Sequence, residues 1–395
     1  MNAVATEGSN PTGRAVYIDG APYRRRAYGA NHPLAIPRVS LTTALLHTYG
    51  ALAPTEIMSA RKAADVELAW FHTSAYIAAF KRAEAVGRVT QAVRERHRLG
   101  TLENPYFDQF FTIPATATGA SIQAAEQVLA GKIAFNPAGG MHHARPDYAQ
   151  GFCFFNDVVL AIQRLRRENL RVLYVDLDAH HGDGVEAAFA GDEQVFTLSL
   201  HMDTAYAYPF VGGQLQDTVA GFTSMNIPLP RDTNDAEYHL LFDTVWIPLL
   251  AKFCPDAIVM QTGTDVIFAD PLGKLQMTTQ GFLAVVARIV DSAPRHVNGT
   301  PCLLATGGGG YHPLVLARAW TGVWAVLSGR ELPDAMPAAG EKLLRDVNWD
   351  LDEDAPYFEQ LFASRLDAAE QQPVRDDVVR LAEALLYHPY IEIAS

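Results

Sequence analysis

RVLYVDLDAHHGDG (171–184) joins a run of apolar, partly β-branched residues to three aspartates and two adjacent histidines. The first half predicts a buried strand, and the polar cluster begins where that strand ends. Further short apolar strands are expected at 132–137, 195–200, 224–229, 256–261 and 301–306. Helical patterns are expected at 156–169, 235–253, 278–293 and 313–329, and over most of 40–130. This alternation predicts an α/β domain with a mainly parallel central sheet flanked by helices.

Composition narrows the class of protein. The chain has 395 residues, 49% of them hydrophobic, and a net charge of −13. This favours a globular protein over a disordered one and disfavours a general nucleic-acid binder. The basic run at 88–98 is interpreted as the solvated face of a helix. No stretch of about 18 apolar residues predicts a membrane span, and the N-terminus lacks a signal-peptide pattern, so a cytoplasmic location is expected.

The cysteines indicate the redox state of the compartment, and the lack of a linker indicates the number of domains. Cys153, Cys254 and Cys302 are far apart and in apolar surroundings, which predicts buried thiols in a reducing compartment. No repeat or Pro/Gly/Ser linker divides the chain. We therefore expect a single domain over 1–395, with a core of about 15–330 and a C-terminal extension of about 331–395. The acidic stretch 346–362 is expected at the surface or in an interface.

Four expected strands are followed by chemically active residues: AGGMHHA (138–144), DLDAHHGDG (176–184), QTGTD (261–265) and TGGGGYH (306–312). In an open α/β sheet, ligands bind outside the carboxyl ends of the strands. These four segments should therefore meet at one edge of the sheet.

Asp178 and His180 are candidate metal ligands. Two residues apart in an extended segment, their side chains face the same way. A catalytic zinc needs three protein ligands and an open position, and Asp265 is the natural third. Such a site leaves room for water and a carbonyl oxygen. The structural alternative is that these aspartates cap helices and pair with arginines.

His142 and His143 are candidates for general acid/base catalysis. Each imidazole needs a carboxylate on its far nitrogen, and Asp176 and Asp183 match them in number. Tyr311 follows four glycines and can donate to a developing oxyanion, although a packing role is the equal alternative. Together these groups suit attack of water on a carbonyl, which is amide hydrolysis.

The residues resemble the zinc-dependent deacetylase family, which includes histone deacetylases, acetoin-utilisation-type deacetylases and acetylpolyamine amidohydrolases. The resemblance is spread over about 29–325 in family order. The matching stretches are GANHPLAIPRVSLT (29–42), FHTSAYI (71–77), GGMHHARPDYAQGFCFFNDVVLAI (139–162), VDLDAHHGDG (175–184), TLSLH (197–201), GTDVIFADPLG (263–273) and GGGGYH (307–312).

The resemblance implies an arginase/deacetylase-type fold and a role for each candidate. Asp178, His180 and Asp265 would hold one catalytic Zn²⁺ per chain, and Tyr311 would stabilise the oxyanion. His143, paired with Asp183, would be the base and acid, and His142, paired with Asp176, would act electrostatically. The implied substrate tunnel is lined by Gly151, Phe152, Tyr208, Glu103 and Gly309. The implied structural K⁺ sites involve Asp176, Asp178, His180, Ser199 and Leu200, and, for a second ion, Phe189 and Val195.

Departures from the family pattern bear on the substrate. Glu103 stands where the family often has a rim aspartate, Pro271 follows Asp270 where eukaryotic class I members usually carry an arginine, and Tyr208 replaces an aromatic Phe. The expected substrate is acyl-lysine in proteins or peptides, with acetylpolyamines or other small acylated amines as the alternative. No nucleic-acid or membrane partner is expected, and a homo-oligomer is compatible with the sequence.

Two rival functions are weighed against this one. The arginase/agmatinase group shares a similar fold but uses two manganese ions, which need further bridging aspartates. Thr262 and Gly263 precede Asp265 here, which favours one metal. A catalytically inactive acyl-lysine-binding protein would be expected to lack Tyr311 or one of the histidines, and the chain has them all.

Overall fold

A computed structural model describes residues 14–24, 28–29, 32–217, 222–349, 354, 360–362 and 373–391. Eight strands form one sheet in the order β2-β1-β3-β8-β7-β4-β5-β6, and every neighbouring pair is parallel. The strands are β1 (Ala15–Asp19), β2 (Ile57–Ser59), β3 (Ile133–Asn136), β4 (Val172–Asp176), β5 (Val195–Met202), β6 (Ser224–Leu229), β7 (Ala257–Gln261) and β8 (Leu303–Thr306). The predicted parallel α/β fold is confirmed.

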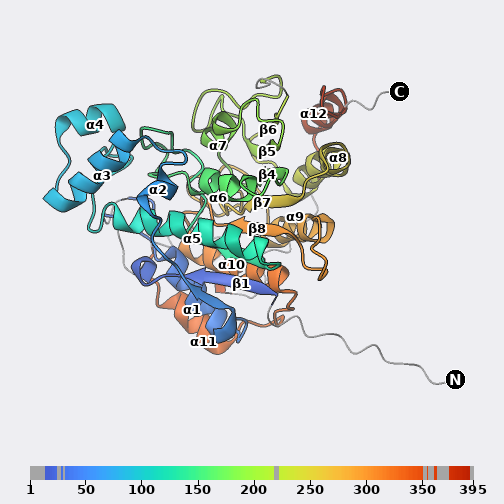
Figure 1. The fold of residues 1–395 in the computed structure, drawn as a ribbon. Coiled ribbons are helices and arrows are strands. Elements are labelled where there is room, and N and C mark those ends of the chain that lie inside the picture. Colours follow the sequence, from blue (N-terminus) through green and yellow to red (C-terminus); the bar gives the residue numbers. More distant parts are fainter. Residues whose placement is uncertain are drawn as a thin grey trace.

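Helices cover both faces of this sheet (Figure 1). They are α1 (Arg38–Thr48), α2 (Asp65–Leu68), α3 (Ser74–Val86), α4 (Gln91–His97), α5 (Thr112–Leu129), α6 (Asp157–Arg166), α7 (Asp183–Ala188), α8 (Asp235–Phe253), α9 (Thr279–Ser292), α10 (Pro313–Ser328), α11 (Ala338–Arg345) and α12 (Asp376–Leu386). Two 3₁₀ turns, η1 (Ala21–Arg24) and η2 (Pro54–Glu56), flank the N-terminal strands. No helix in the described ranges is long and apolar enough to cross a bilayer.

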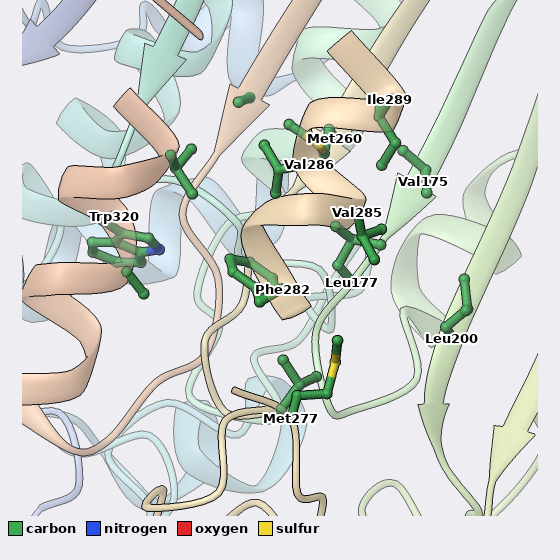
Figure 2. Packing of buried hydrophobic residues seen from close by; sticks show 14 of the residues in the cluster. Val175, Leu177, Leu200, Met260, Met277, Phe282, Val285, Val286, Ile289 and Trp320 are labelled. Carbon is green, nitrogen blue, oxygen red and sulfur yellow. The ribbon is translucent and has the colours of Figure 1, made fainter. Parts of the chain in front are cut away.

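Alternate residues of each strand pack into different cores. Leu173 and Val175 of β4 face the core built with α1, α8, α9 and α10. Val172 and Tyr174 face the core built with α5 and α6. Because successive strand side chains point to opposite faces, a strand covered on both sides must be apolar throughout. Figure 2 shows the first core from close by, with Val286 of α9 beside Met260 and Ile289 of α9 beside Val175.

Strand and helix ends follow local sequence signals. Asn156 caps α6 and accepts a hydrogen bond from the Val159 backbone N–H at 3.0 Å. Asn234 and Glu237 form a reciprocal capping box at the start of α8. These caps fix where each helix begins and therefore how each preceding loop leaves the sheet.

Three features of the N- and C-terminal parts differ from expectation. Two short strands were not expected: β1 precedes the region predicted as helical (40–130) and β2 lies within it, and both are too short to give a periodic signal. Cys153 and Cys302 are buried as predicted, but Cys254 is exposed because it forms the left-handed C-terminal cap of α8. Most of the acidic stretch beyond 349 lies outside the described residues, although Asp354 within it is buried.

Candidate active site

Four adjacent strands bring the candidate residues to one edge of the sheet. β3, β8, β7 and β4 are neighbours in the sheet and all point the same way. Their carboxyl ends lead into the segments that carry His142, Tyr311, Asp265 and Asp178 respectively. Residues up to 169 positions apart in sequence, such as His142 and Tyr311, are thus delivered to one place by strand order alone.

Asp178, His180 and Asp265 form a compact cluster. One ligand atom from each lies within 4.8 Å of the others. The His180 Nδ1 is 3.2 Å from an Asp178 oxygen and 2.9 Å from an Asp265 oxygen. Both aspartates are buried, and backbone N–H groups of Gly309 and Ala179 hold their remaining oxygens at 2.6 and 2.9 Å. Two oxygens and one nitrogen held by a rigid shell are a donor set that fits Zn²⁺.

The electrostatics of this cluster favour a cation at its centre. Burial and the neighbouring Asp178 carboxylate raise the pKa of Asp265 to about 7. Burial lowers the pKa of His180, but hydrogen bonds to Asp178 and Asp265 outweigh it and raise that pKa to about 10. Two buried carboxylates repel each other unless a positive charge lies between them, and a divalent cation can supply that charge.

The adjacent histidines each contact one aspartate. His142 Nδ1 lies 2.8 Å from Asp176, and His143 Nδ1 lies 2.7 Å from Asp183. All four side chains are buried, and the two Nε2 atoms are 2.9 Å apart. Each histidine therefore has its far nitrogen held by a carboxylate, which fixes the orientation of the ring.

The two histidines have opposite proton affinities. Burial lowers the pKa of His142, but the Asp176 and Asp178 carboxylates outweigh it and raise the pKa to about 9. Burial and the neighbouring His142 lower the pKa of His143 to about 4. At neutral pH His142 is therefore a cation and His143 a neutral base, which is the division of roles that acid/base chemistry requires.

Tyr311 is fixed beside this cluster by its backbone. Its N–H donates to the Asp270 carboxylate at 2.6 Å, and its ring centroid is 6.5 Å from that of His180. Burial, together with Asp265 and Asp178, raises the pKa of its phenol well above the usual value. The hydroxyl thus keeps its proton and is available as a hydrogen-bond donor.

A cavity of about 290 Å³ opens onto these residues. Its lining includes the predicted tunnel residues Gly151, Phe152, Tyr208 and Glu103, together with His143, His180 and Tyr311. The Tyr208 ring lies 4.8 Å from the His143 ring, and a Cβ on Gly151 would collide with His143. Gly309 does not line this cavity but lies behind it, where its N–H holds Asp178.

Several residues that support the site were not singled out from the sequence. Asp183 is held by Arg145 at 2.6 Å and by Gln150 at 2.7 Å, and Gln261 Nε2 is 2.9 Å from His142 Nδ1. The Arg38 guanidinium donates to the Gly308 carbonyl and helps to line a second cavity of about 120 Å³. All four lie within stretches that the sequence analysis quotes, but nothing in the spacing of a single polar residue says which side chain it will contact, so only the folded chain reveals these roles.

The residues expected around potassium lie on β4, β5 and the loop between them. Asp176 and Ser199 are register partners of these strands, and Leu200 follows Ser199. Phe189 ends α7, and its carbonyl accepts the N–H of Asp192. His181 is buried, with its ring 4.6 Å from that of His201 and its Nε2 3.5 Å from Glu186.

A parallel α/β sheet that carries two carboxylates, an imidazole and two carboxylate-backed histidines at one cavity defines a hydrolase of the metal-dependent class. Residues 32–327 match the family model for the histone deacetylase domain. The chain therefore belongs to the histone deacetylase family, whose members hydrolyse amide bonds and depend on zinc. This decides against the arginase group as its family.

Similar proteins and solved structures support the same family assignment. The chain is 36% identical to histone deacetylase 8 of Xenopus tropicalis over 82% of this chain and 86% of the relative. It is 35% identical to the acetoin utilization protein AcuC of Bacillus subtilis over 80% of this chain and 82% of that protein. It spans about 64% of the longer histone deacetylase 1 of Homo sapiens, at 36% identity over 78% of this chain. The HDAC homolog from Aquifex aeolicus superposes with a TM-score of 0.87 and 36% identity, over 94% of this chain and 99% of that one.

Proposed function

We propose that this chain is a zinc-dependent amidohydrolase that removes acetyl or other acyl groups from amines, with acyl-lysine in proteins or peptides as its main substrate. One observation carries the proposal. The Asp178–His180–Asp265 cluster and the His143–Asp183 pair, at 2.7 Å, each present a histidine to a single cavity, which aromatic side chains such as Phe152 and Tyr208 also line. Aromatic walls suit the unbranched apolar stem of an acylated lysine.

The metal would be held by Asp178, His180 and Asp265. When bound, zinc polarises a carbonyl oxygen and lowers the pKa of water. The chain's own contribution is to hold these ligands in place, through the N–H groups of Gly309 and Ala179.

His143 would hold and move the proton. Its Nδ1 is engaged by Asp183, so Nε2 is the atom that accepts a proton from the attacking water and later returns it to the leaving amine. His142 stays a cation beside it and stabilises negative charge. Tyr311, which keeps its phenol proton, donates to the oxygen that becomes negatively charged when the carbonyl is attacked. The water O–H bond breaks as His143 takes the proton, and the amide C–N bond breaks as the leaving amine receives that proton.

We also propose structural potassium at the predicted positions. The inner ion would be held by Asp176, Asp178, His180, Ser199 and Leu200. Asp176 and Ser199 are register partners on β4 and β5, which supports this because oxygen-bearing residues of two neighbouring strands then lie side by side. The second ion would lie near Phe189 and Val195, at the loop that joins α7 to β5.

The function is tested by measuring kcat/KM on an acetyl-lysine peptide, longer acyl-lysine peptides and N-acetylputrescine, with the metal removed by a chelator and then restored. We expect activity on acyl-lysine to fall roughly 100-fold or more on removal and to return with zinc. Tyr311→Phe and His143→Ala should each lower kcat by roughly 100-fold or more. The exposed Tyr387 provides a matched control, as Tyr387→Phe should leave kcat unchanged.

The outcomes separate the parts of the proposal. Unchanged hydrolysis after complete metal removal would contradict the metal-dependent mechanism. Full activity in Tyr311→Phe and His143→Ala would contradict the residue roles but not the metal ligands. A higher kcat/KM on N-acetylputrescine than on every acyl-lysine peptide would replace the main substrate by the small acylated amine.

A further inference from the structure

Two basic side chains, Arg231 and Lys274, lie at the mouth of the active-site cavity. Both line the cavity that contains His143 and Tyr311. Arg231 follows β6, whereas Lys274 lies in the loop that follows β7. The backbone N–H of Asp232 donates to the Lys274 carbonyl at 2.8 Å, so the two segments run side by side. Both charges therefore stand on one wall of the entrance.

Both charges are available to a ligand. Arg231 and Lys274 are exposed, and no ion pair with a carboxylate within 4.0 Å is found for either among residues 14–391 that the structure describes. The Arg231 guanidinium lies 4.9 Å over the Tyr206 ring, and the Lys274 Nζ donates to the Pro271 carbonyl at 2.9 Å. These contacts orient the side chains but leave their charge uncompensated and further donors free.

Two acidic residues lie near these cations. Asp203 accepts hydrogen bonds from the Ala205 N–H at 2.9 Å and the Gln214 amide at 2.8 Å, both neutral donors. Asp232 is exposed and lies next to Arg231 in the chain without forming an ion pair with it. The nearby Arg375 bonds the Arg231 carbonyl, and its own charge is paired with Glu237. Two cations and two anions therefore balance on this wall, although the whole chain carries −13.

The lining of the cavity also includes one carboxylate. Glu103 accepts the Gly151 N–H at 2.8 Å and sits on the loop that follows α4. Arg231 and Lys274 come from the segments after β6 and β7, so the acid and the two cations reach the cavity from different loops. Such an arrangement discriminates among substrates by the charges next to the acylated amine.

We infer that Arg231 and Lys274 form a subsite for a carboxylate of the substrate. Acyl-lysine peptides with Asp or Glu beside the acyl-lysine would be preferred over neutral and basic peptides. Acylated polyamines, whose ammonium groups would approach the same two cations, would be disfavoured. This inference rests on the proposed function and names the class of substrate within it.

The test compares three acetyl-lysine peptides of equal length that differ only in the residues flanking the acetyl-lysine, which are Glu, Gln or Lys. N-acetylspermidine is measured beside them. For the unmodified protein at low ionic strength we expect kcat/KM to be roughly 3- to 10-fold higher for the Glu peptide than for the Lys peptide, because exposed charge pairs are individually weak. The ratio should shrink toward one in concentrated salt, and the double variant Arg231→Glu/Lys274→Glu should reverse it.

A matched control is offered by Lys252. Its Nζ also donates to a proline carbonyl, that of Pro389 at 3.4 Å, and lies over an aromatic ring, that of Tyr390. It stands near the end of α8, which leads to the amino end of β7, away from the cavity mouth. Lys252→Glu should leave the Glu-to-Lys peptide ratio unchanged. A ratio taken within one variant does not depend on how much of that variant is folded.

The results distinguish this inference from the function on which it rests. If none of the peptides is hydrolysed, the proposed function itself is contradicted. Hydrolysis of all three at equal kcat/KM, or a ratio that survives reversal of both charges, would overturn the carboxylate subsite alone. N-acetylspermidine hydrolysed faster than the Glu peptide would also overturn it.

Discussion

Five histidines in and around the site show that surroundings, not residue type, set proton affinity. At His142 and His180 the neighbouring carboxylates outweigh burial, and the pKa values rise. Burial lowers the pKa values of His72 and His201. At His143, burial and the neighbouring His142 outweigh the contact with Asp183, and the pKa falls. A residue's chemistry in this protein therefore depends on which charges the fold places against it.

His72 gives a stability prediction at this scale. Its Nε2 accepts the Asn156 N–H at 3.0 Å, and burial lowers its pKa to about 3. Below the unfolded pKa of about 6.5 the unfolded chain binds a proton that the folded chain does not, so stability falls as pH falls toward 3. Between pH 7.5 and pH 5 this costs about 2 kcal/mol, at about 1.36 kcal/mol per pH unit. Urea unfolding measures this loss. Between pH 7.5 and pH 5 the free energy of unfolding of His72→Gln should fall by about 2 kcal/mol less than that of the unmodified protein. Equal falls in the two proteins would contradict the role of His72.

At the scale of elements, the turns after β7 and β8 are shaped by the carboxylates that they enclose. A Cβ on Gly263 would overlap the Asp178 carboxylate, and a Cβ on Gly309 would overlap that of Asp265. Neither glycine has a positive φ, whereas Gly308 and Gly310 have φ of 149° and 130°. Glycine is therefore required for two different reasons: close approach of a carboxylate at Gly263 and Gly309, and a positive φ at Gly308 and Gly310.

Gly263→Ala should weaken metal binding. The added methyl displaces the Asp178 carboxylate, and displaced or unsupported ligands cost roughly 10- to 100-fold in affinity. The measurement is the Kd for zinc, by competition with a chromophoric chelator, in protein whose folding is checked by circular dichroism. Gly29→Ala is the control, because its Cβ would meet nothing within 4 Å. A Kd within twofold of the unmodified protein in folded Gly263→Ala would show that the turn tolerates a side chain.

At the scale of the whole molecule, the C-terminal helix α12 is fastened to the sheet layer through α8 (Figure 1). Glu237 at the start of α8 is fully buried, and Arg375 bonds both of its oxygens at 2.7 and 2.8 Å. The Arg375 N–H adds a third bond at 3.0 Å. The same α8 packs beside α9, which covers the strands that end at the site.

Arg375→Gln should lower the free energy of unfolding by about 1–3 kcal/mol, because it leaves a buried carboxylate with fewer partners. Solvent screens this pair in part, because the Arg375 side chain is 40% exposed, and that limits the loss. Urea denaturation provides the measurement. Arg345→Gln, which breaks an exposed pair with Glu341 on α11, is the matched control and should cost less than about 0.5 kcal/mol. Equal effects of the two substitutions would contradict a structural role for the buried pair.

Much of the architecture was predictable because both faces of the sheet are covered. Strands such as 172–176 are apolar throughout and helices such as 235–253 are periodic, so both stand out in the sequence. β1 and β2 were not found because five and three residues are too few to show a pattern. Cys254 was misassigned because its neighbours are apolar, while the left-handed cap turns it outward.

The parallel α/β class and the reactive residues at the strand ends follow from the sequence alone, since hydrophobic pattern and side-chain chemistry are local properties. Which of these groups touch depends on the folded chain. The pairing of His143 with Asp183, the support of that pair by Arg145 and Gln150, and the meeting of Arg231 with Lys274 at the entrance all join distant segments. Distances between such segments depend on strand order and packing, which no local pattern encodes.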